Sequence, residues 1–196
     1  CSTLDNERLL LEKILNPNAE TSKRTLCMTL EKIILTDIYW GVNLKRSVIL
    51  TNETARNRLR YLDFSRNSII NWLNLDGFMV QGYDYIQYAN LQSINMRKVS
   101  ASFFASFPSL KVLLLGGNKL AESFSSSKSR DMFHANHKLE ILDLSANGII
   151  SLPKQLLQNN KNLTELNISG NHLSDFDVNL DVQIQLQLIN LTGNSL

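Results

Sequence analysis

Two histidines in the segment 121–138 have the residue type and spacing that come closest to a metal site. His134 and His137 form an HxxH pair, and imidazole is a common zinc ligand. No cysteine or further histidine lies close by in the sequence, and the surrounding AESFSSSKSRDMFHANHK is rich in serine, which indicates a surface insertion. We therefore expect no metal at this pair, although two imidazoles that titrate near neutral pH could sense acid.

An alternating run of acids and amides at 175–181 resembles the first half of a calcium loop. Its oxygen-bearing side chains stand at every second position, which suits Ca²⁺: Asp175, Asp177, Asn179 and Asp181. The sixth position is Leu180 instead of Gly, and the twelfth is Leu186 instead of Glu. Of the two interpretations, a calcium site or the solvated face of an alternating segment, these departures favour the solvated face.

No catalytic motif is recognisable in the sequence. It contains no GxSxG, HExxH, P-loop or GxGxxG pattern, so we expect neither an enzyme nor a cofactor. A net charge of +2 is too small to indicate general nucleic-acid binding. No run of about 18 apolar residues is present, so we expect no membrane-spanning segment within this sequence.

The two cysteines, Cys1 and Cys27, have two open interpretations. In a secreted chain they could form a disulfide, and in a cytosolic chain they would be unpaired thiols. The sequence begins without Met and without a signal-peptide pattern, which is typical of a processed or excised segment. Four N-x-S/T sequons are candidate glycosylation sites, although about three are expected by chance in this composition: Asn52, Asn162, Asn167 and Asn190.

The elements that must position these residues come from a repeated pattern, LxxLxLxxNxL. Five copies keep the asparagine: LRYLDFSRNSI, LKVLLLGGNKL, LEILDLSANGI, LTELNISGNHL and LQLINLTGNSL. Two weaker copies, LEKIILTDIYW and LQSINMRKVSA, have Ile38 and Val99 in its place. The first leucines are spaced by 29, 32, 19, 29, 24 and 23 residues, and the value of 19 is shorter than one repeat usually allows.

The LxL core predicts a short strand in each copy, because alternating residues of a strand point to opposite faces. The asparagine must leave the strand with its amide inside, where it bonds the backbone of neighbouring turns. This is the leucine-rich repeat. We expect an α/β solenoid, a horseshoe with a parallel β-sheet on its concave face and an irregular or helical convex side. Repeats occupy 30–196, with starts near 30, 59, 91, 110, 139, 163 and 186, and 1–29 is a degenerate N-terminal repeat or flanking segment with a helix at 5–16.

The variable positions of LxxLxLxx predict a recognition surface on the concave face. Val112, Leu114 and Ile141 should cluster there as apolar groups beside Asp143 and Tyr61, and the copy at 91 would add Ser93 and Asn95. Arg66, Arg97 and Lys98 would form a basic edge. The aromatic segment 72–88 is either a further recognition surface or a folded-over loop with its own core, and contains Trp72, Phe78, Tyr83, Tyr85 and Tyr88. The alternative interpretation is that these residues are apolar groups scattered over the surface without a common binding role.

Residues 30–196 resemble the ectodomains of Toll-like receptors. The resemblance rests on LRYLDFSRNSI, LEILDLSANGIISLP and KNLTELNISGNHL, and on Pro153 directly after Leu152. It implies a single-pass innate-immune receptor, in the extracellular space or the endosomal lumen, whose membrane segment lies outside this sequence. Such a receptor binds a microbial or endogenous ligand (lipid, protein or nucleic acid) and dimerises. Residues 1–29 depart from the usual N-terminal cap, and an adhesion or matrix protein and a cytosolic scaffold remain alternatives.

Overall fold

The computed structural model describes residues 31–34, 36, 59–67, 84–125 and 127–196. The expected helix at 5–16, both cysteines, Asn52 and the aromatic residues Trp72, Phe78 and Tyr83 lie outside these ranges. Among the described residues, no helix is long and apolar enough to cross a membrane.

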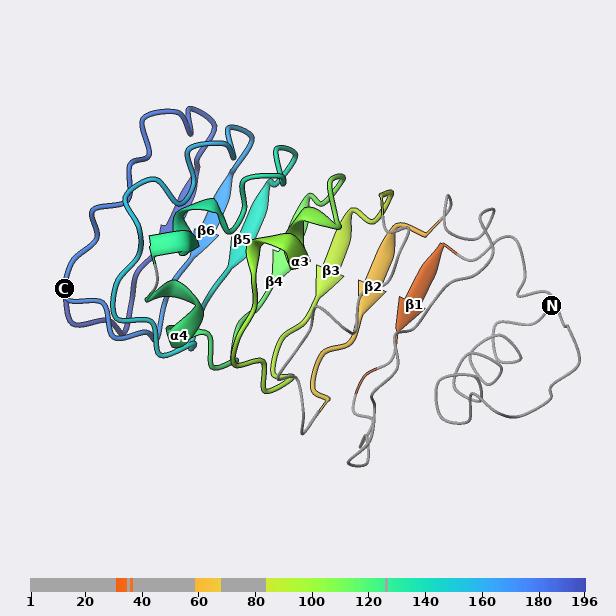
Figure 1. Ribbon diagram of the computed structural model, residues 1–196, viewed down its shortest axis with the longest axis horizontal. Helices are drawn as coiled ribbons and strands as arrows, with labels where there is room; N and C mark the ends of the chain where they lie inside the picture. Colours follow the sequence, from red (N-terminus) through yellow and green to blue (C-terminus); the bar gives the residue numbers. More distant parts are fainter. Residues whose placement is uncertain (1–30, 35, 37–58, 68–83, 126) are drawn as a thin grey trace, which may run out of the picture.

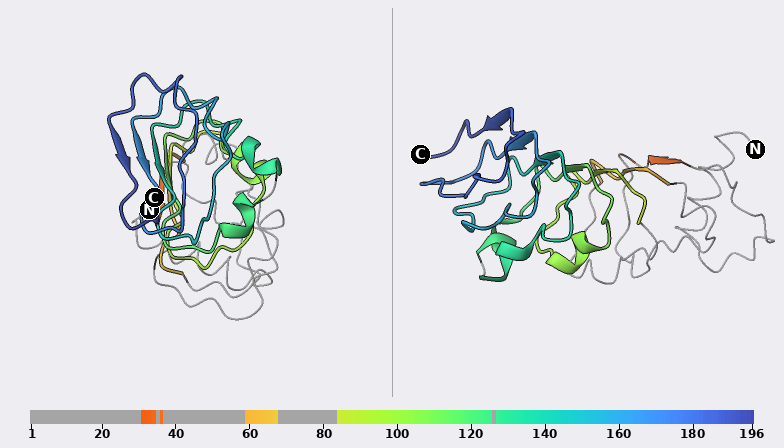
Figure 2. Two further views of the ribbon diagram at one scale, coloured as in Figure 1. Left: turned by 90° about the vertical axis from the view of Figure 1, so that its left-hand side faces the viewer. Right: turned by 90° about the horizontal axis from the view of Figure 1, so that it is seen from above.

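A parallel sheet of seven strands runs along one side of the solenoid in chain order (Figure 1). Its strands are β1 (Lys32–Ile34), β2 (Tyr61–Asp63), β3 (Tyr88–Asn90), β4 (Val112–Leu114), β5 (Ile141–Asp143), β6 (Glu165–Asn167) and β7 (Leu188–Asn190). The opposite side carries α3 (Ala101–Ala105), α4 (Ala121–Phe124) and the 3₁₀ helix η2 (Ser127–Asp131) (Figure 2). The expected solenoid, with a parallel sheet on one face and an irregular or helical opposite side, is confirmed.

The middle residues of strands β2 to β6 point into the core. Leu62, Leu113, Leu142 and Leu166 are at most 2% exposed, because one face of a strand packs inward while its two neighbours point outward. Behind the sheet, Phe104 packs against Phe103 and Phe133, with ring centroids 5.1 and 5.2 Å apart. Neighbouring repeats share this core, so each repeat depends on the next for burial.

The repeat asparagines form the expected inward ladder. Asn171 donates from Nδ2 to the carbonyls of Leu144 and Ile168, and its Oδ1 accepts the N–H groups of Asn147 and Ile149. Asn118, Asn147 and Asn194 donate to the preceding repeat in the same way. The amide thereby satisfies backbone groups that the tight turn after each strand leaves without a strand partner.

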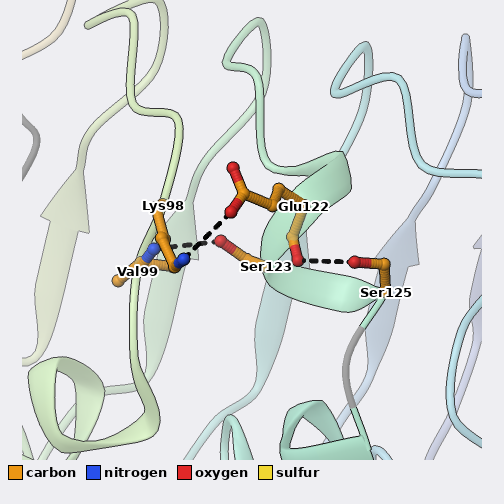
Figure 3. A network of polar contacts seen from close by, with 5 residues as sticks. All are labelled: Lys98, Val99, Glu122, Ser123 and Ser125. Carbon is orange, nitrogen blue, oxygen red and sulfur yellow. Dashed lines mark hydrogen bonds and ion pairs between the residues drawn. The ribbon is translucent and has the colours of Figure 1, made fainter.

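The copy placed at 91 was wrong. β3 pairs Tyr88 with Tyr61 on one side and with Val112 on the other, so the repeat begins at Ile86 and its spacings become 27 and 24 residues. Ile94 stands where other repeats have asparagine, and Asn118 Oδ1 accepts its N–H at 3.1 Å. Val99 lies beyond the turn, where its N–H donates to Ser123 Oγ at 2.9 Å (Figure 3).

A second set of amides borders the core at the turn before three strands. Asn136, Asn160 and Gln183 each stand three residues before the first leucine of a repeat, and each donates to two carbonyls of the repeat before. Their side-chain oxygens are buried and have no hydrogen-bond partner among the described residues. The nitrogen is therefore the atom that ties these turns together, at the cost of a buried oxygen that is not satisfied.

The residue before the ladder position has a left-handed backbone in six repeats. Its φ is 58° at Arg66, 54° at Ser93, 70° at Gly117, 50° at Ala146, 65° at Gly170 and 69° at Gly193. A non-glycine residue pays about 1–2 kcal/mol in this region. At Gly117 an added Cβ would also lie 2.7 Å from Ser93 Oγ.

Gly117→Ala is therefore expected to lower the free energy of unfolding by about 1–2 kcal/mol. The matched change, Ala146→Gly at the equivalent turn, should be close to neutral, because relief of backbone strain offsets the entropy that glycine gains in the unfolded chain. Urea titration of both variants measures the two effects. Equal stability of Gly117→Ala and the parent chain would show that this turn does not need glycine.

Candidate functional site

Two rows of side chains cover the outward, concave face of the sheet. Pairing in register brings the first residues of the strands together, and this first row contains Lys32, Tyr61, Tyr88, Val112, Ile141, Glu165 and Leu188. The third residues form the second row, with Ile34, Asp63, Asn90, Leu114, Asp143, Asn167 and Asn190. Neighbouring side chains in a row are about 5 Å apart, the spacing of paired strands.

Aromatic and aliphatic groups are adjacent in the middle of these rows. The rings of Tyr61 and Tyr88 stack at 4.1 Å with an interplanar angle of 5°, and Lys32 Nζ lies 4.1 Å from the Tyr61 ring centroid. Val112 and Ile141 continue the first row, and Leu114 lies beside them in the second. We call Tyr61, Tyr88, Val112, Leu114 and Ile141 the apolar stripe; every member is half-buried.

Opposite charges flank the apolar stripe in the first row. Lys32 precedes the stripe and Glu165 follows it, and both side chains are exposed. The apolar centre is therefore flanked by a cation on β1 and an anion on β6.

Tyr88 is the titratable group that this packing perturbs. Burial, a side-chain hydrogen bond with Tyr61 and the nearby charge of Asp63 raise the pKa of the Tyr88 phenol from 10.0 to about 12. The phenol thus stays neutral on the folded sheet at a pH where an unfolded chain would ionise it.

Stability is expected to fall as pH rises from about 10 to about 12, because there the unfolded state loses the Tyr88 proton and the folded state keeps it. Below pH 10 both states are protonated and this contribution is complete. Ultraviolet titration of tyrosinate should show one step near pH 12 that is absent from Tyr88→Phe. A late step that persists in Tyr88→Phe would assign the raised pKa to another tyrosine.

The second row is polar from Asp63 to Asn190 except at Leu114. In five repeats the oxygen of its Asp or Asn accepts the N–H two residues later, at 2.8–3.2 Å, from Ser65, Gln92, Ser145, Ser169 or Thr192. Gln92 Nε2 also donates to Asp143 Oδ2 at 3.0 Å across the intervening repeat. Gly116 permits this bridge, since an added Cβ there would lie 3.1 Å from both atoms.

The structure brings together only part of the predicted recognition surface. Tyr61, Val112, Leu114, Ile141 and Asp143 lie side by side on the sheet. Arg66 is exposed at the turn after β2, and Tyr85 is exposed before β3 with the Arg60 guanidinium 5.0 Å from its ring.

The basic edge is not formed as predicted. The repeat begins at Ile86, and therefore Arg97 and Lys98 lie past the turn that follows β3. Lys98 forms an ion pair with Glu122 of α4 at 2.9 Å (Figure 3). Ser93 and Asn95, expected on the concave face, lie in that turn with positive φ angles. Lys32 and Asn90 were missed, and Tyr88 was predicted as part of the aromatic segment 72–88, not as a strand residue. A repeat spacing near 24 would have placed Tyr88 and Asn90 on β3.

The metal candidates have other roles. Asn159 Nδ2 lies 2.7 Å from His134 Nδ1, Asp177 pairs with Lys154 at 3.2 Å, and Asn179 Oδ1 accepts the Asp181 N–H. Among the residues that the structure describes, no three His, Cys, Asp or Glu side chains gather closely enough to hold a metal.

The alternating segment before β7 is not one strand: Val178 is buried and Ile184 is 87% exposed.

Comparisons with known proteins agree with this geometry. Residues 162–180 match the family model of the Leucine Rich Repeat. The chain is similar to a chain in the structure of the Toll–Spatzle complex from Drosophila, with 16% sequence identity and a TM-score of 0.54, over 86% of this chain and 27% of that one. No curated protein matches the sequence. The chain has the leucine-rich repeat solenoid fold, which is typically a non-enzymatic scaffold for protein interaction.

Proposed function

We propose that this chain is the ligand-binding part of a Toll-like receptor ectodomain, located in the extracellular space or the endosomal lumen, and that it binds a protein with the apolar stripe. The observation that carries the proposal is the stripe itself. Five aromatic and aliphatic side chains are adjacent on four neighbouring strands. The helices of the described residues lie on the opposite side of the solenoid from this sheet (Figure 2).

The composition of the stripe favours a protein over a nucleic acid. Tyrosine and aliphatic groups are typical of the centres of protein interfaces, and the carboxylates of Asp63, Asp143 and Glu165 border this centre. These carboxylates would repel phosphates. The structural neighbour, Toll bound to Spatzle, is a molecular hub in Drosophila development and innate immunity.

The Toll-like part of the proposal also rests on the motifs shared with those ectodomains, above all LEILDLSANGIISLP and KNLTELNISGNHL. In such a receptor, ligand binding leads to dimerisation of receptor chains and thereby to signalling. The present chain spans 27% of the Toll chain that it resembles, so dimerisation is a property expected of the longer receptor.

Val112→Arg is expected to weaken binding of a protein ligand at least tenfold, about 1.4 kcal/mol, because it places an unpaired charge in the centre of the interface. The measurement uses a yeast-displayed library of secreted proteins, with anionic lipid vesicles and double-stranded RNA as the other probes. Ile184→Arg is the matched control, since Ile184 is 87% exposed and lies away from the sheet.

Two results would contradict the proposed site or ligand class. Binders that tolerate Val112→Arg but are lost with Ile184→Arg would move the site off the concave face. A chain that binds only vesicles or RNA would exclude the protein-ligand proposal.

A further inference from the structure

Two asparagines of the second row are held in place by the oxygen of their side-chain amide. Asn167 Oδ1 accepts the Ser169 N–H at 3.2 Å and the Ser169 hydroxyl at 2.8 Å. Asn190 Oδ1 accepts the same pair of groups from Thr192, at 3.1 and 2.8 Å. Neither of these turns therefore relies on the amide nitrogen.

The ladder asparagines use the opposite end of the amide. Nδ2 of Asn147, Asn171 and Asn194 donates to at least two backbone carbonyls each, and all three side chains point into the solenoid. A substituent on those nitrogens would break the ladder. A substituent on Nδ2 of Asn167 or Asn190 would instead leave the hydrogen bonds of Oδ1 intact and would extend from the open face of the sheet.

We propose that Asn167 and Asn190 both carry N-linked glycans, which together cover the β6–β7 end of the concave face. Both lie in sequons, Asn167-Ile168-Ser169 and Asn190-Leu191-Thr192. In the transfer, the bond from sugar C1 to the diphosphate of a lipid-linked oligosaccharide breaks and a bond from C1 to Nδ2 forms. The amide nitrogen gives up one proton to a base, and the lipid diphosphate leaves.

The two glycans would stand next to each other. Asn167 and Asn190 are paired in register on neighbouring strands, so their side chains start about 5 Å apart on the same face. The equivalent residues of β2 and β5 are Asp63 and Asp143, each two residues before a serine. An Asp→Asn change would turn either position into a sequon. In the second row, only β6 and β7 have an asparagine followed two residues later by a serine or threonine.

This placement divides the concave face into two parts. The stripe on β2–β5 stays open, while the glycans exclude a protein from β6 and β7. Binding of a protein to the stripe rests on the proposed function, whereas glycosylation of Asn167 and Asn190 does not require that the stripe bind anything.

Peptide mapping of the secreted chain tests the proposal directly. Enzymatic removal of N-glycans in ¹⁸O-water converts each glycosylated asparagine to ¹⁸O-labelled aspartate, and we expect the label at both Asn167 and Asn190. An unlabelled residue at either position overturns the paired arrangement, most clearly if the exposed sequon of Asn162, which lies off the sheet, is labelled in the same sample.

Substitution of the sequon hydroxyls gives a second readout. Ser169→Ala and Thr192→Ala should each remove the mass of one glycan. Ser145→Ala, at the same position of the β5 repeat, should remove none because residue 143 is aspartate. If an alanine variant is not secreted, the map of the parent chain still decides the proposal.

Asp143→Asn separates this proposal from the proposed function. It creates a sequon with Ser145 and should add a glycan beside Ile141, in the middle of the stripe. Binding of a protein selected from the displayed library should then fall at least tenfold. Undiminished binding by a variant glycosylated at residue 143 would overturn the stripe as the binding site while leaving the glycans on Asn167 and Asn190 established.

Discussion

Leu144→Asp is expected to abolish cooperative unfolding of the array and to leave the chain largely unfolded. Leu144 is 0% exposed and lies directly after β5, in the middle of the described repeats. Its replacement removes a buried side chain, worth about 2–5 kcal/mol. It also adds a carboxylate to a core whose described buried residues include no lysine or arginine. Because each repeat needs its neighbours for burial, the defect should spread in both directions along the solenoid.

Circular dichroism during thermal unfolding measures this effect, and Ile184→Asp is the matched control. Ile184 is 87% exposed, so the same carboxylate there should change the melting temperature little. A sigmoidal transition of Leu144→Asp at the temperature of the parent chain would show that residue 144 does not face a shared core.

Asn171→Ala has the second largest expected effect, a loss of about 3 kcal/mol in the free energy of unfolding. The change leaves two buried carbonyls and two buried N–H groups without their side-chain partner, and each unsatisfied buried group costs about 1–3 kcal/mol before the turn relaxes. The affected groups belong to two neighbouring repeats, so the coupling between repeats should weaken as well.

Denaturant titration checks this prediction against Asn179→Ala. Asn179 is exposed, and its side-chain oxygen accepts the Asp181 N–H at a surface turn. The control should therefore cost less than about 1 kcal/mol. Similar losses in the two variants would mean that the ladder contributes no more than a surface turn.

The architecture was predictable because the pattern is both local and repeated. Strands β2, β4, β5, β6 and β7 each begin two residues after the first leucine of a copy that keeps its asparagine. In the copies that contain β2, β4, β5 and β6, the three apolar residues of the LxxLxL core are all buried. Whether a strand residue faces the core or the solvent follows from the alternation of apolar and polar residue types, without knowledge of distant contacts.

The third repeat was misplaced because two of its key positions depart from the template. Ala89 occupies the middle of β3, and Ile94 the ladder position. Leu91, Ile94 and Met96 then fitted a later copy by residue type alone. The spacing of 19 was the available warning, and the structure replaces it with 27 and 24.

Apart from the asparagine ladder, the side-chain interactions between repeats could not be predicted from the repeat template. The Tyr61–Tyr88 stack requires the correct register of β3, and the Gln92–Asp143 bridge joins residues 51 positions apart. The second set of amides was missed because its members are neither identical in type nor part of the repeated template. Contacts of this kind depend on which side chains the strand pairing brings together, and the repeat template does not encode them.

Hydroxyl-radical footprinting of the glycosylated chain, with and without a protein selected from the displayed library, tests the central claim most directly. Mass spectrometry reads the oxidation of each side chain. We expect a several-fold fall at Tyr88, Leu114 and Ile141 when the protein is bound, and no change at Ile150 or Ile184, which are exposed away from the sheet. Protection of Ile150 or Ile184 with unchanged oxidation of Tyr88 would contradict the assignment of the concave stripe as the binding site.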